Sequence, residues 1–191
     1  METISANAAD PFKHRFILFD TNILSALASS KRAARFSNIY DLLGDKQCEM
    51  TVLNSTKFEL IGYCNDKAIY DKLNAWVDRF VVLDIKNEDV ELAAFLSAIY
   101  KYRSHEISPK QISFCDCLNA AQLIKYQGRL PLVTADIHDY PLFLFDIAKT
   151  MVIDDNGKAV FVGVIVYNEN KWLSLKEKFE KSGNQNSANE N

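Results

Sequence analysis

Hydrophobic positions along the chain switch between two spacings, and the switch predicts strands and helices in turn. Residues 16–19 (FILF) form a short apolar run, which is typical of a strand that is buried on both faces. The run ends at Asp20, and apolar residues then return at helical spacing over 23–27. A strand that leads through a polar residue into a helix is therefore expected at the start of the fold.

The same alternation continues along most of the chain. It predicts further strands over 48–53, 80–83, 130–134, 151–153 and 159–167. It predicts further helices over 36–43, 58–61, 69–77, 87–102 and 172–179, and one more that ends at Gly128. That last helix has two candidate starting points, at Ser108-Pro109 and at Ser113, and the sequence leaves both open.

Strands that alternate with helices favour an α/β fold with a mainly parallel central sheet that helices cover on both faces. Asn156-Gly157 is a favoured tight-turn pair, so a C-terminal β-hairpin is expected over residues 150–168. The expected organisation is a flexible arm over 1–13, one domain over 14–168, a short helix over 169–181 and a disordered tail over 182–191.

Composition narrows the class of protein. The chain has 191 residues, 48% hydrophobic and 25% charged, as in an ordinary globular protein with a substantial core. Its net charge of −3 argues against a protein coated in basic patches. The four cysteines show no zinc-finger spacing, the first residues lack a secretory apolar segment, and no apolar run reaches membrane-spanning length. We therefore expect a cytoplasmic protein with reduced thiols and no membrane association.

Two carboxylates stand where predicted strands end. Asp20 follows the first strand, and Asp136 follows the strand over 130–134. Ligands of α/β sheets bind at the carboxyl ends of the strands, so both positions suit an active site. The structural alternatives are that Asp20 only caps a helix and that Asp136 only forms a local turn.

Two more acids belong to predicted helices. Glu59 lies three residues after Thr56, and Asp116 lies three residues after Ser113, and both spacings also fit a structural capping box. If the helix instead starts at Ser108-Pro109, Asp116 is interior, which is an unusual place for an unpaired acid. Asp139 is expected to be a solvated turn residue.

Together the four acids indicate a metal site more than each does alone. A doubly wound sheet would bring them to one end of the molecule, where their charges would repel and raise one another's pKa. Divalent cations relieve such repulsion, and Mg²⁺ and Mn²⁺ prefer carboxylate and water oxygens.

Four segments, each with one of these acids, match a known family in the family's order. The segments are FILFDTNIL, TKFEL, SFCDCLNAAQLI and LVTADIHDY, spread over about residues 15–140. On these segments the chain resembles the PIN-domain ribonucleases, which include the VapC-type toxins of bacterial toxin–antitoxin pairs. The apparent hairpin and helix after Met151 have no counterpart in that pattern.

The resemblance implies an α/β/α sandwich and a divalent-metal-dependent endoribonuclease that binds Mg²⁺ or Mn²⁺. It implies RNA as substrate, and it makes an antitoxin partner and a homodimer plausible. It assigns the catalytic and metal-binding acids to Asp20, Glu59, Asp116 and Asp136. By the same resemblance Asn22 and Thr134 support the pocket, and Asp139 is a further metal ligand.

Two rival functions are weighed against the nuclease. In phosphatases of the haloacid-dehalogenase type a second Asp follows two residues after the first, but here that position is Asn22. A catalytically inactive PIN-like domain that binds RNA or a protein is the main alternative. RNA binding would need positive charge, for which the sequence offers Lys13, Arg15, Lys31, Arg32, Arg35 and Lys57.

Overall fold

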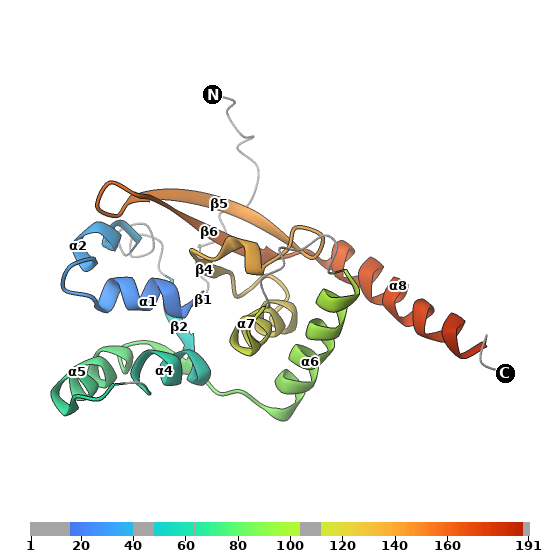
Figure 1. Ribbon diagram of the computed structural model, residues 1–191, viewed down its shortest axis with the longest axis horizontal. Helices are drawn as coiled ribbons and strands as arrows, with labels where there is room; N and C mark the ends of the chain where they lie inside the picture. The colour runs from blue at the N-terminus through green and yellow to red at the C-terminus, as the bar shows by residue number, and fades with distance from the viewer. Residues whose placement is uncertain (1–15, 40–47, 63, 104–111, 189–191) are drawn as a thin grey trace, which may run out of the picture.

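The computed structural model describes residues 16–39, 48–62, 64–103 and 112–188 (Figure 1). Its centre is a six-stranded mixed sheet in the order β3-β2-β1-β4-β6-β5. Three of the five strand pairings are parallel and two are antiparallel. The predicted α/β class with a mainly parallel sheet and a C-terminal hairpin is confirmed.

The parallel part of the sheet comes from the short apolar runs. It contains β1 (Phe16–Phe19), β2 (Glu49–Leu53), β3 (Val81–Leu83) and β4 (Leu132–Thr134). β1 lies between β2 and β4, and Phe19 pairs with Val133. Because β1 and β4 are parallel neighbours in this register, the residues that follow them emerge side by side at one edge of the sheet.

The antiparallel part is a long hairpin. It consists of β5 (Phe145–Asp154) and β6 (Ala159–Tyr167), and β6 pairs with β4. The turn uses positive φ at Asn156 (60°) and Gly157 (79°), as the Asn-Gly pair predicts. β5 starts six residues earlier than the predicted strand over 151–153, because pairing with β6 continues through polar positions that an apolar pattern does not mark.

Helices pack on both faces of the sheet, which gives three layers. β1 alternates its sides: Ile17 and Phe19 face one core with α1 (Thr21–Ala28), and Leu18 faces the other core with α7 (Phe114–Lys125). The first core also receives α2 (Ala33–Phe36) and α5 (Lys67–Val77), and the second receives α6 (Asn87–Tyr102) and α8 (Glu169–Ala188). Figure 1 shows the two helix groups on either side of the strands, with α4 (Asn54–Ile61) beside α5.

Several predicted boundaries differ from the structure. α7 starts at the second candidate signal, with Ser113 as its N-cap, and the first signal lies outside the described residues. α2 ends at Phe36, where the helix predicted over 36–43 begins, and residues 40–43 of that prediction lie outside the described residues. The predicted arm over 1–13 also lies outside the described residues. α8 continues as helix to Ala188, into the segment expected to be disordered, since no proline interrupts it. Among the helices described, none is long and apolar enough to span a bilayer.

Candidate active site

Asp20 lies at the junction of β1 and α1 and is the N-cap of that helix, as the structural alternative predicts. Its Oδ1 accepts a hydrogen bond from the Thr21 backbone N–H at 2.7 Å. Its Oδ2 accepts two more, from the Thr134 hydroxyl at 2.6 Å and the Asn22 side-chain amide at 2.8 Å. The side chain is 5% exposed, so a carboxylate is held in the interior by three donors.

Asn22 joins the ends of β1 and β4. Its amide nitrogen lies 3.1 Å from Thr134 Oγ1 and 3.2 Å from Asp136 Oδ2, in addition to its contact with Asp20. Its amide oxygen accepts the Ala135 backbone N–H at 3.0 Å, which fixes the orientation of the amide group. One side chain therefore contacts two carboxylates, Asp20 beside it in the sequence and Asp136, which lies 114 residues after Asn22.

Thr134 and Asp136 complete this network on the β4 side. The Thr134 hydroxyl is fully buried, donates to Asp20 and accepts the Asp136 backbone N–H at 2.9 Å. Asp136 itself is exposed. Its backbone is thus anchored while its carboxylate faces solvent beside the buried Asp20.

The electrostatics of Asp20 indicate an uncompensated charge. Its pKa is raised from 3.8 to about 6, and burial is the largest cause. The negative charges of Asp116 and Asp136 contribute to this rise, and the hydrogen bonds from Thr134 and Thr21 oppose it. Two other acids are therefore close enough to repel Asp20 through the protein interior.

Asp116 has two roles in the structure. It is the third residue of α7 and forms a capping box with Ser113, whose hydroxyl donates to Asp116 Oδ2 at 2.6 Å. The alternative in which Asp116 lies inside a helix that starts at Ser108-Pro109 is wrong. The charge of Asp116 nevertheless acts on Asp20 and on the buried Tyr140, so this acid belongs electrostatically to the same site as Asp20.

Glu59 is connected to the same edge through Thr21. The Thr21 hydroxyl donates to Glu59 Oε2, and this links α1 to α4. The Thr56 capping box is wrong, because α4 starts at Asn54 with Leu53 as N-cap and no side-chain cap. On its other side Glu59 meets the Cys115 thiol, whose pKa is raised to about 12 by burial and by its hydrogen bond to Glu59.

Asp139 differs from its prediction. It is 4% exposed, not solvated, and lies at the end of the short 3₁₀ helix η2 (Ile137–Asp139). Its charge acts on the buried Tyr100 hydroxyl, whose pKa is raised well above its ordinary value chiefly by burial. The turn pattern of the sequence does not reveal that η2 folds inward.

Sequence reasoning missed two buried polar residues beside the acids. Tyr140 is 1% exposed, and its pKa is raised well above the ordinary value by burial and by the charges of Asp20 and Asp116. Asn119 is also buried, and its amide lies 3.4 Å from the Tyr140 hydroxyl. The available signal was spacing, because Asn119 lies three residues after Asp116 on one helix face.

The acids converge without forming a ready coordination shell. The described residues contain no group of three or more His, Cys, Asp or Glu side chains arranged to hold a metal ion. The donor chemistry nevertheless suits a hard divalent cation, because Asp20, Asp116 and Asp136 offer carboxylate oxygens whose mutual repulsion such an ion would relieve. The acids therefore suit such a cation in chemical type, although the described side chains are not arranged to coordinate one.

Comparisons with known proteins give a resemblance in structure but none in sequence. The sequence matches no protein-family model and no curated relative. Among solved structures it is similar to VapC20 of Mycobacterium tuberculosis, described as a toxin that cleaves the sarcin–ricin loop. The two are 16% identical, the match covers 58% of this chain and 82% of that one, and the TM-score is 0.44.

Proposed function

We propose that the chain is a divalent-cation-dependent endoribonuclease with a PIN-like domain over residues 14–168. The observation that carries the proposal is the Asn22 bridge between Asp20 and Asp136, with the charge of Asp116 acting on the same buried carboxylate. A purely structural account explains each acid separately. It does not explain why the fold presses like charges together at the edge of the sheet.

Asp20, Asp116 and Asp136 are the residues that would hold Mg²⁺ or Mn²⁺, with Glu59 as a fourth oxygen donor. When bound, such an ion supplies an activated water and stabilises charge that develops on a phosphodiester. Asp139 is proposed only as an outer acid, because it is buried towards Tyr100.

The chain's own groups position these donors. Asn22 and Thr134 hold Asp20 in one orientation, since both donate to its Oδ2. Asp136, exposed beside them, can accept a hydrogen bond from a water that approaches the substrate phosphorus. Asp116 and Glu59 are at present hydrogen-bonded to Ser113 and Thr21, so their side chains would turn when the cation binds.

The proposed chemistry fits more than one biological role. A cytoplasmic toxin with an antitoxin partner, or a homodimer of such chains, would use the same chemistry as an RNA-processing enzyme. Growth arrest on expression, relieved by a neighbouring small gene product, would support the toxin role.

The test is RNA cleavage in Mg²⁺ or Mn²⁺ by the wild type and by Asp20→Asn, Asp116→Asn and Asp136→Asn. We expect each variant to lose at least about 100-fold in rate, as loss of a key electrostatic group does. Asp84→Asn removes an exposed acid elsewhere and should leave cleavage unchanged.

Equal cleavage by all four variants would contradict the proposal. RNA binding without cleavage by the wild type would favour the alternative, an inactive PIN-like domain that binds RNA or a protein.

A further inference from the structure

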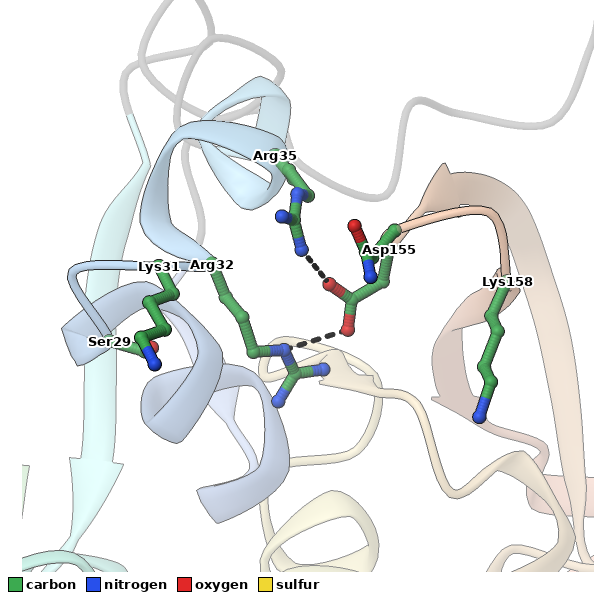
Figure 2. A pocket seen from close by; sticks show the side chains of 7 residues that line it. Ser29, Lys31, Arg32, Arg35, Asp155 and Lys158 are labelled. Carbon is green, nitrogen blue, oxygen red and sulfur yellow. Dashed lines mark hydrogen bonds and ion pairs between the residues drawn. The ribbon is translucent and has the colours of Figure 1, made fainter.

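A basic pocket lies between the loop after α1, helix α2 and the tip of the β5–β6 hairpin (Figure 2). Its volume is about 430 Å³, and its lining includes Ser29, Lys31, Arg32, Arg35, Asp155 and Lys158. Four of these side chains are cationic and one is anionic, which leaves a formal charge of +3 in a chain whose net charge is −3. The pocket therefore concentrates positive charge on an otherwise acidic protein.

The positive charges of this pocket are only partly neutralised. Arg32 Nε lies 2.8 Å from Asp155 Oδ2, and Arg35 lies 2.6 Å from Oδ1, so both arginines share one carboxylate. Their hydrogen bonds and charges lower the pKa of Asp155, which stays ionised. Lys31 and Lys158 have no ion-pair partner among the described residues. Figure 2 shows the Arg32 and Arg35 guanidinium groups reaching Asp155 from the α2 side, with Lys158 on the hairpin side.

Contacts within the fold hold the groups that line the pocket. Arg32 stacks 4.9 Å from the centre of the buried Phe36 ring. Asp155 and Lys158 close the tight turn through backbone hydrogen bonds in both directions. Arginines fixed in this way lose little conformational entropy on binding, and their unused N–H groups match the planar, bidentate geometry of phosphate oxygens.

The pocket is a short distance from the acidic cleft. Helix α1 starts directly after Asp20 and has eight residues, which span about 12 Å. On the hairpin, Gly163 pairs with Thr134 of the cleft, and four further residues to Ala159 span about 14 Å. Both lengths correspond to about four stacked nucleotides, at roughly 3.4 Å per nucleotide, between the pocket and the acidic site around Asp20.

We infer that this pocket binds two neighbouring backbone phosphates of a single RNA strand whose scissile bond lies at the acidic site around Asp20. A polyanionic strand suits the excess charge better than a carboxylate does, because the arginines already share one carboxylate and the two lysines are left over. The inference rests on the proposed function only for the position of the scissile bond. Of the other basic candidates, Lys57 is paired with Asp78, and Lys13 and Arg15 lie outside the described residues.

The test compares two double variants of equal charge. Lys31→Gln with Lys158→Gln removes pocket charges that support no ion pair. Lys101→Gln with Lys178→Gln removes two exposed charges on α6 and α8, on the other side of the molecule in Figure 1. Binding of a fluorescent octanucleotide RNA is measured by anisotropy in EDTA, so it does not depend on cleavage.

We expect the pocket variant to weaken octanucleotide binding about tenfold at roughly 0.15 M salt and to reduce the salt slope by about 1.4, as loss of two phosphate contacts on a single strand predicts. The control variant should change affinity less than about twofold, as exposed charges outside the RNA path contribute little. A dinucleotide carries only one phosphodiester and cannot reach from the pocket to the acidic site, so the pocket variant should lose clearly less affinity for it than for the octanucleotide.

Equal weakening by the two double variants, or none by either, would overturn the inference. Equal loss for dinucleotide and octanucleotide would mean that the pocket holds an isolated phosphate and not part of a strand, and would also overturn it. So would loss of polyglutamate binding with RNA binding intact, which would indicate an acidic peptide. If RNA is never cleaved but the expected binding pattern appears, the proposed function fails and the pocket inference stands.

Discussion

Replacement of Asp20 by Asn should change how the stability of the metal-free protein depends on pH. In the folded protein the pKa of Asp20 is about 6, and its ordinary value is 3.8. Because the folded-state pKa is raised, Asp20 favours folding fully below about pH 3.8. That contribution is lost as the pH rises towards 6, and the loss is complete above it.

The size of this effect follows from the pKa difference. A difference of one pKa unit corresponds to about 1.4 kcal/mol, so the charged Asp20 costs the folded state about 3 kcal/mol at neutral pH. About 2 kcal/mol of that cost develops between roughly pH 4 and pH 7. The Asn variant is also destabilised, because its amide would face the fixed amide of Asn22. This cost does not vary with pH, because Asn does not titrate.

The assay is urea unfolding in EDTA at several pH values between about 4 and 7, followed by the fluorescence of the two tryptophans. We expect the free energy of unfolding of the wild type, relative to Asp20→Asn, to fall by about 2 kcal/mol across this range, or roughly 1 M in midpoint. Asp84→Asn is the control and should show no such trend. A difference between wild type and Asp20→Asn that is constant with pH would refute the view that Asp20 is a buried, uncompensated charge.

Three further predictions concern the surroundings of the cleft. Mn²⁺ at about 100 times its dissociation constant should stabilise the wild type by about 2.7 kcal/mol and raise its Tm, because the ion binds only the folded state. In a thermal-shift assay, Asp116→Asn should remove most of that rise in Tm. Ser113→Ala should cost about 1 kcal/mol in urea unfolding by removing the α7 cap, whereas an unchanged midpoint would argue against the capping box. Gly163→Ala should cost about 1 to 3 kcal/mol, because its Cβ would lie 2.8 Å from Ile137 Cγ1, and a variant as stable as the wild type would contradict that packing.

Much of the fold could be predicted from local patterns. Buried parallel strands are continuous apolar runs, so residues 16–19 and 130–134 were recognisable, and the Asn-Gly pair marked the hairpin turn. The length of β5 was not recognisable, because an edge strand keeps polar residues on its exposed side. Its true start depends on pairing with β6 and not on its own composition.

The site shows the same limit. The positions of Asp20 and Asp136 followed from strand ends in a parallel sheet, and the contacts through Asn22 agree with them. The burial of Asp139 depends on how η2 folds beneath the sheet edge, which the local turn pattern does not encode. The basic pocket is the clearest case, because Arg32 and Asp155 are 123 residues apart and meet only through the overhang of the hairpin.

A crystal structure of the wild-type protein with Mn²⁺, read from the anomalous signal of the metal, tests the central claim most directly. We expect an ion at the carboxyl ends of β1 and β4, bound by oxygens of Asp20 and Asp136, with the Asp116 carboxylate turned from Ser113 towards it. A site without an ion at saturating Mn²⁺, with Asp116 still bonded to Ser113, would contradict the claim that these acids form one cation-binding cleft.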